Sequence, residues 1–168
     1  MQLNMVKVDI VEYEPRYQDQ VVALVSPIQI IEFAVPITAE EQPDLMDIRG
    51  TFQHGLGNFW LAVHDGQVVG SIGLVDIGTK SVALKKMFVR ADFRGKTAGV
   101  AAALMECAKQ WCRDKGIATI YLGTVAQMKA AHRFYEKNGF TEIACESLPP
   151  SFPLVHVDTK FYVCNLEE

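Results

Sequence analysis

One stretch of this sequence combines backbone flexibility with positive charge just ahead of an expected helix. It runs Met87-Phe88-Val89-Arg90-Ala91-Asp92-Phe93-Arg94-Gly95-Lys96-Thr97-Ala98-Gly99-Val100. A strand pattern leads into a turn that carries Arg94 and Lys96, and Gly95 and Gly99 let a ligand approach the backbone. Because a helix N-terminus offers free N–H groups and a partial positive charge, this arrangement is typical of a phosphate site. A plain strand-to-helix loop with solvated cations is the alternative.

A second stretch places a phenol on a short helix that ends at a glycine. It runs Ala131-His132-Arg133-Phe134-Tyr135-Glu136-Lys137-Asn138-Gly139-Phe140. Ala131 and Tyr135 lie one turn apart on the same helical face, so the small residue leaves room beside the phenol. The alternative is a core tyrosine whose hydroxyl is hydrogen-bonded. His132 falls on the polar side of this helix, and we interpret it as a surface residue.

Hydrophobic spacing predicts the elements that must hold these two stretches. Strand patterns cover residues 6–13, 59–64, 68–76, 82–89, 119–124, 140–145 and 158–166, and helical patterns cover 15–26, 40–52, 100–115 and 130–137. Asp65-Gly66 predicts a hairpin, and Pro27 is expected to stop or kink the first helix near Ser26. The order predicts a mixed α/β (α+β) sheet with helices on its faces. With no repeat or linker, we expect a single domain over residues 1–168.

Together the two stretches resemble motifs of the GNAT superfamily of N-acetyltransferases. Arg94-Gly95-Lys96-Thr97-Ala98-Gly99 is similar to the family's pyrophosphate motif, R-x-x-G-x-G, and Leu84–Val89 to the strand before it. The second stretch matches the family pattern A-x-x-x-Y-E-K-x-G-F at every fixed position. The resemblance covers about Phe59 to Phe140. It implies the acyl-CoA N-acyltransferase fold, with about seven strands and about four helices.

The resemblance also implies roles for individual residues. Acetyl-CoA would be the cosubstrate, with no metal. Its pantetheine arm would bond to the main chain of Met87, Phe88 and Val89, and its pyrophosphate would lie on the amides of Arg94, Gly95, Lys96, Thr97, Ala98 and Gly99. Tyr135 would protonate the departing thiolate, since a phenol keeps its proton at neutral pH. The amine would attack the thioester directly, and a backbone N–H near Phe88 or Val89 would stabilise the oxyanion.

Three positions depart from the family pattern. Thr97 stands where a glycine is usual, and we expect it to serve as the N-cap of the following helix rather than to adopt a positive φ. Met128 stands where an asparagine often precedes the second helix. Ala83 stands where relatives often carry a glutamate that acts as general base. Weaker cofactor binding at Thr97 therefore stays open.

Because Ala83 cannot accept a proton, another group must take the proton of the ammonium substrate. The candidates are Asp76, which closes a strand, Glu32, which lies between the first two helices, His54, and ordered water. Asp76 and Glu32 are the catalytic candidates beside Tyr135. For each of these side chains the alternative is a solvated surface group.

The segment 26–52 is expected to form one wall of the acceptor site, because the family builds that site from its most variable region. Its carboxylates outnumber its single cation, Arg49; they are Glu32, Glu40, Glu41, Asp44 and Asp47. Such a rim would attract a polyamine, an aminoglycoside, an amino acid or a peptide amine, or it simply solvates a helix. The aromatic residues Phe33, Phe52, Phe59 and Trp60 line a pocket or belong to the core. The sequence does not identify the acceptor.

Net charge, hydrophobicity and cysteine content indicate the general class of protein. The 168 residues carry a net charge of −4, which is unlike a nucleic-acid-binding protein. No apolar run approaches the roughly 20 residues that span a bilayer, and no signal sequence is evident, so we expect a cytoplasmic protein. The four cysteines form no CxxC pair, and we interpret them as reduced thiols rather than metal ligands. The resemblance suggests a homodimer through the strands after Pro153, without fixing the oligomeric state.

Two other functions stay open beside N-acetylation of a small molecule or peptide. Ala83, Thr97 and Met128 are compatible with a catalytically weak or inactive acyl-CoA-binding sensor or interaction module. Acetylation of a nucleic-acid-bound target would require a basic patch. The cations that cluster in the sequence are Lys80, Lys85, Lys86, Arg90, Arg94 and Lys96.

Overall fold

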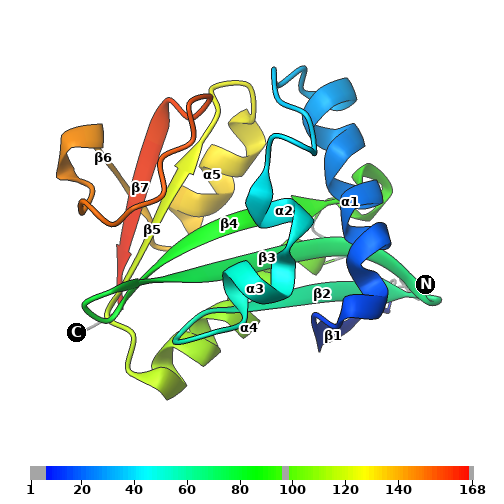
Figure 1. The fold of residues 1–168 in the computed structure, drawn as a ribbon, viewed down its shortest axis with the longest axis horizontal. Coiled ribbons are helices and arrows are strands. Elements are labelled where there is room, and N and C mark those ends of the chain that lie inside the picture. Colours follow the sequence, from blue (N-terminus) through cyan, green and yellow to red (C-terminus); the bar gives the residue numbers. More distant parts are fainter. Residues whose placement is uncertain (1–6, 96–98, 167–168) are drawn as a thin grey trace, which may run out of the picture.

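A computed structural model describes residues 7–95 and 99–166 of the chain. Within them, seven strands form one sheet in the order β1-β2-β3-β4-β5-β7-β6 (Figure 1). The strands are β1 (Asp9–Glu12), β2 (Asn58–His64), β3 (Gln67–Gly78), β4 (Ser81–Val89), β5 (Thr119–Thr124), β6 (Thr141–Ile143) and β7 (Lys160–Asn165). β4 and β5 are parallel, and the other neighbours are antiparallel. This confirms the predicted mixed α/β sheet.

Helices cover both faces of the sheet (Figure 1). α1 (Gln18–Pro27), α2 (Pro43–Met46) and α3 (Ile48–Phe52) pack with Phe59 and Leu61 of β2, whereas α4 (Val100–Lys115) and α5 (Lys129–Lys137) pack with Trp60 and Ala62. Successive strand residues point to opposite faces, so continuous apolar runs such as Asn58–His64 can supply both cores. No helix among the described residues is both long and apolar enough to cross a membrane.

The segment predicted as one helix from residue 40 to 52 is two short helices, α2 and α3. They meet at Asp47, whose φ of −138° and ψ of 76° leave the helical region. The Asp47 carboxylate accepts a hydrogen bond of 3.0 Å from the Gly50 N–H and so caps α3. A capping aspartate competes with helix continuation, which is why the single helix was wrong.

The first helix, which was expected to stop or kink near Ser26, does not stop there. α1 includes Pro27 and continues into a π-helical turn, Ile28–Glu32, where the Phe33 N–H bonds to the Ile28 carbonyl at 3.1 Å. The φ of Pro27 is −63°, which is helical, and a proline removes only one N–H donor. The wider turn carries the chain toward the carboxyl end of β4.

β4 and β5 pair only over their first three residues. Ser81, Val82 and Ala83 lie beside Thr119, Ile120 and Tyr121. Beyond Ala83, β4 continues to Val89 and β5 to Thr124, and the described residues form no further β-ladder between them. The two strands therefore diverge into a fork whose closed end is at Ala83, and backbone groups of both arms face the gap.

Candidate active site

A β-bulge in β4 shapes one arm of the fork. Ser71 of β3 lies opposite Phe88, yet Gly73 lies opposite Lys85, so β4 has one residue more than β3 between these pairs. Lys86 takes a φ of +56° at this point. The Ser71 hydroxyl donates a hydrogen bond of 2.7 Å to the Lys86 carbonyl, which holds a backbone that an L-residue rarely adopts.

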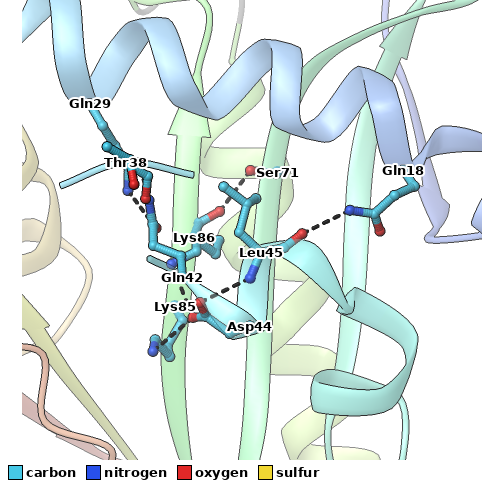
Figure 2. A network of polar contacts seen from close by, with 9 residues as sticks. All are labelled: Gln18, Gln29, Thr38, Gln42, Asp44, Leu45, Ser71, Lys85 and Lys86. Atoms are coloured by element: carbon cyan, nitrogen blue, oxygen red, sulfur yellow. Dashed lines mark hydrogen bonds and ion pairs between the residues drawn. The ribbon is translucent and has the colours of Figure 1, made fainter. Parts of the chain in front are cut away.

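The bulge brings two consecutive lysine side chains to the same carboxylate (Figure 2). The Lys85 and Lys86 ammonium groups lie 2.8 Å and 3.0 Å from Oδ2 of Asp44 in α2. In a regular strand these side chains would point to opposite faces. The Asp44 and Lys86 side chains are only 12% and 8% exposed, so this cluster is part of the protein interior. Because two lysines share one carboxylate, the cluster of three side chains carries a net positive charge.

Burial and mutual attraction compete within this cluster. Burial tends to raise the pKa of Asp44, but the charges of Lys86 and Lys85 and their hydrogen bonds outweigh it, so that pKa is lowered. Burial lowers the pKa of the Lys86 ammonium below its ordinary value, although Asp44 opposes the shift. The cluster is held together by a buried ion pair and is sensitive to the loss of either partner.

A pair of buried side-chain amides links the π-helical turn to the loop that precedes α2. Gln29 and Gln42 donate hydrogen bonds to each other at 3.0 Å and 2.8 Å, and Gln42 donates another to the Thr38 carbonyl at 3.0 Å (Figure 2). Both glutamines are less than 9% exposed. These bonds join the π-helical turn to the loop before α2, and α2 in turn carries the Asp44 that binds the two lysines of the β4 bulge.

A cavity of about 100 Å³ occupies the fork. It is bounded by both strand arms, by the amide pair, by α5 and by the loop before β7. Its lining includes Leu84, Lys85, Lys86, Met87, Phe88, Gly123, Thr124, Val125, Met128, Tyr135, Val155, Val157 and Asp158. An apolar cluster of Val35, Ile37 and Val125, with Met128 and Val155 packed against it, closes one side.

Tyr135 reaches this cavity from α5. It is 6% exposed, and its ring contacts the rings of Phe140 and Tyr162 at centroid distances of 5.7 Å and 6.0 Å. Burial, with a smaller contribution from the Asp158 charge, raises the pKa of the Tyr135 phenol. The phenol therefore keeps its proton at neutral pH, as a general acid must.

Asp158 is a cavity residue that the sequence pattern did not identify. It lies in the loop before β7, and its carboxylate packs on the other arm of the fork: a Cβ added to Gly123 would be 2.7 Å from its Oδ2. Burial raises the pKa of Asp158 to about 6, although the charges of Lys85 and Lys86 lower it. A carboxyl group that titrates near neutrality inside a cavity is suited to proton transfer.

The fold has counterparts among known proteins. The model of the acetyltransferase (GNAT) family matches residues 26–140. The chain belongs to this family. A crystal structure of a GNAT-family acetyltransferase from Staphylococcus aureus Mu50 is 36% identical, with a TM-score of 0.92 over 96% of this chain and 100% of that one.

Two further known proteins are similar to this chain, one in sequence and one in fold. The N-acetylaspartate synthetase of Danio rerio is 35% identical over 102 residues, which is 60% of this chain and 36% of that protein. PaiA N-acetyltransferase from Thermoplasma acidophilum, solved with coenzyme A, shares the fold at a TM-score of 0.72 and 15% identity, over 95% of this chain and 99% of that one. The chain spans 36% to 57% of the length of the first curated relatives that it matches.

The GNAT cofactor motif is described in part. Met87 and Phe88 line the cavity, and Val89 ends β4. Gly95 and Gly99 have φ of +106° and +62°, which explains why glycine stands at both positions. Gly99 is the N-cap of α4, whereas the expectation that Thr97 caps this helix concerns a residue outside the described ranges. Lys96, Thr97 and Ala98 lie outside the described residues.

The structure places Glu32 against Arg94, not in the fork. Arg94 donates through both terminal nitrogens to the Glu32 carboxylate and through Nε to the Val89 carbonyl at 2.7 Å. The hydrogen bond from Arg94 lowers the pKa of Glu32. A carboxylate with a lowered pKa is a weaker proton acceptor, and it does not line the cavity of Tyr135.

Asp76 and His54 also lie away from Tyr135. The Asp76 carboxylate accepts hydrogen bonds of 2.9 Å from the N–H groups of Leu56 and Gly78, and these bonds lower its pKa. It faces Val82, at the closed end of the fork. His54 lines a separate groove beside β1 and β2. Asp76 therefore holds two turns through these hydrogen bonds. Neither Asp76 nor His54 lines the cavity that Tyr135 reaches.

The acidic segment 26–52 does not form a continuous rim. Glu32, Asp44 and Asp47 are bound as described above, and Glu41 accepts hydrogen bonds from the N–H and hydroxyl of Thr38. Of the four aromatic residues expected to line a pocket or belong to the core, Phe52, Phe59 and Trp60 are core residues, at most 4% exposed. His132, expected at the surface, is half-buried, and its Nε2 lies 2.9 Å from the Val125 carbonyl.

Four of the basic residues that cluster in the sequence form ion pairs with carboxylates. Lys85 and Lys86 are bound to Asp44, Arg90 to Asp92 and Arg94 to Glu32. These pairs partly compensate the charge of four of the six basic residues that cluster in the sequence. In the described part of the chain no three metal-ligating side chains gather, and all four cysteines are free thiols.

Proposed function

We propose that this chain transfers the acetyl group of acetyl-CoA to a primary amine of a small molecule or peptide. The observation that carries the proposal is the fork between β4 and β5 with the Tyr135 phenol at its cavity. A thioester lying along β4 between Met87 and Val89 would place its sulfur where the phenol can reach it. The coenzyme A in the Thermoplasma relative supports the same substrate here.

The chain's own residues divide the work in this proposal. The free backbone of β4 beyond Ala83 binds the pantetheine amides as a neighbouring strand would. The N-terminus of α4 at Gly99 and the side chain of Arg94 hold the pyrophosphate. To do so, Arg94 exchanges Glu32 for phosphate oxygens or bridges both. A backbone N–H near the bulge stabilises the oxyanion, and Tyr135 donates its proton to the leaving sulfur.

Calorimetric titration with acetyl-CoA, CoA and desulfo-CoA tests the substrate, and thiol release with a panel of amines tests the reaction. The proposal predicts one site for acetyl-CoA and turnover of at least one amine class. Absence of acetyl-CoA binding would contradict it. Binding without turnover of any amine would favour the inactive acyl-CoA-binding module instead.

A further inference from the structure

We infer that the acceptor is an amine that also carries a carboxylate, such as an amino acid, with its ammonium on Asp158 and its carboxylate at Lys85 and Lys86. This inference rests on the proposed acetyl transfer. It concerns the amine acceptor, which would enter the fork from the side opposite to acetyl-CoA.

The two arms of the fork carry opposite charge. On the β4 arm, Lys85 and Lys86 share one oxygen of Asp44, so three charged groups leave one net positive charge at the cavity wall. Each ammonium has three donors, and Asp44 takes one from each. On the β5 arm, Asp158 packs on Gly123 and supplies one negative charge.

The charges are close enough to act on one another. Lys85 and Lys86 both lower the pKa of Asp158, and Asp44 raises it. A ligand with both an ammonium and a carboxylate group would compensate both charges: its carboxylate would face Lys85 and Lys86, and its ammonium would face Asp158. A polyamine would place a second cation against the lysines, and a simple amine would leave the lysine wall uncompensated.

Asp158 is also the group that can take the proton that Ala83 cannot. None of the hydrogen bonds or ion pairs among the described residues engages its carboxylate, and Tyr135 lies near enough to feel its charge. The other titratable groups that act on it are Lys85 and Lys86 from β4, Asp44 from α2 and His156 from its own loop.

With Asp158 as the proton acceptor, the protons and electrons of the transfer balance. The ammonium gives one proton to Asp158, and the nitrogen lone pair forms the C–N bond to the thioester carbon. The C–S bond breaks, its electrons leave on sulfur, and sulfur takes the phenolic proton of Tyr135. The second proton lost from nitrogen restores the phenol through solvent, and Asp158 releases its proton to water.

Matched acceptor pairs test the charge requirement. Each amino acid is compared with its carboxamide, which keeps the amine and side chain but lacks the anion, and simple diamines and polyamines are included. We expect kcat/KM for the best amino acid to exceed that for its amide by about tenfold or more, since a site built for a polar group rejects the analogue without it. Lys85→Met and Lys86→Met should each raise KM for the acid and move the ratio toward one.

Two control variants separate charge from folding. Lys137→Met removes an exposed lysine of α5 and should leave the ratio unchanged. Lys86→Arg keeps the charge and should retain more of the preference than Lys86→Met. If Lys86→Met does not fold, Lys85→Met decides the outcome, because Lys85 is more exposed, at 16% against 8%.

Asp158→Asn tests the proton acceptor. We expect kcat to fall by about 10²-fold or more, with acetyl-CoA affinity unchanged by calorimetry. The wild-type kcat/KM should rise through an inflection near pH 6 that Asp158→Asn abolishes and His156→Gln preserves. An inflection that persists in Asp158→Asn would overturn the assignment.

The outcomes distinguish this inference from the proposed function. Equal or better turnover of amides or polyamines would overturn the inference and leave acetyl transfer intact. Acetyl-CoA binding without turnover of any amine, or no acetyl-CoA binding, would overturn both.

Discussion

The Ser71 hydroxyl donates a hydrogen bond of 2.7 Å to the Lys86 carbonyl at the point where β4 has one residue more than β3. This bond links the closed core of the sheet to the arm of the fork that faces acetyl-CoA in our proposal. The same extra residue turns Lys86 toward Asp44, beside Lys85. One hydroxyl therefore supports both the backbone path of β4 and the positive wall of the cavity.

Ser71→Ala is expected to loosen this bulge. Losing a buried hydrogen bond and leaving the Lys86 carbonyl without its partner should lower the free energy of unfolding by about 1–3 kcal/mol. The dissociation constant of acetyl-CoA should rise, because β4 no longer keeps its path. Urea denaturation and calorimetry measure the two effects. Ser147→Ala, at an exposed serine, should change neither; an equal effect of both substitutions would contradict the role of Ser71.

Much of this arrangement was predictable from local sequence. The strand patterns, the Arg94–Gly99 loop and the Tyr135 helix all depend on short-range spacing, and each lies where the pattern placed it, apart from the residues outside the described ranges.

The rest depends on contacts between distant segments. Lys85 and Lys86 are adjacent in sequence, and nothing local indicates that a bulge turns both toward Asp44. Asp158 stands in an aperiodic loop, and only its packing on Gly123 puts it in the fork. Conversely, Glu32 and Asp76 looked available in the sequence because their partners, Arg94 and two backbone N–H groups, are set by tertiary structure.

Asp158 should make the protein more stable as pH falls. Its folded pKa of about 6 exceeds the ordinary value near 4, so between these values the folded chain holds a proton that the unfolded chain has lost. Raising the pH through this window therefore lowers the free energy of unfolding, and the loss is complete above about pH 6.

The substitution Asp158→Asn removes this penalty. It should raise the free energy of unfolding by about 1–3 kcal/mol near pH 7.5, with a gain that shrinks steadily from pH 6 to pH 4. Chemical denaturation across this range measures it. A gain that is independent of pH, or a loss of stability near pH 7.5, would show that the carboxylate is not destabilised by burial.

Glu32→Gln and Asp76→Asn should leave catalysis largely intact. Both carboxylates are engaged outside the cavity, so kcat should stay within about threefold, far from the 10²-fold or greater loss expected for a missing general base. Asp76→Asn should still cost about 1 kcal/mol of stability, because it weakens two hydrogen bonds to backbone N–H groups. Steady-state kinetics measure kcat, and thermal denaturation measures the stability. A loss of kcat of about 10²-fold or more in either variant would restore the substituted carboxylate as a candidate general base.

The most direct test of the whole account is the turnover of Tyr135→Phe, measured with acetyl-CoA affinity and set against Tyr121→Phe. Tyr121 lies on β5 beside Ala83, outside the cavity lining, and makes a matched control. We expect Tyr135→Phe to lower kcat by about 10²-fold or more with unchanged acetyl-CoA binding, and Tyr121→Phe to keep near wild-type turnover. Equal kcat in wild type and Tyr135→Phe would contradict the role of the phenol at the fork.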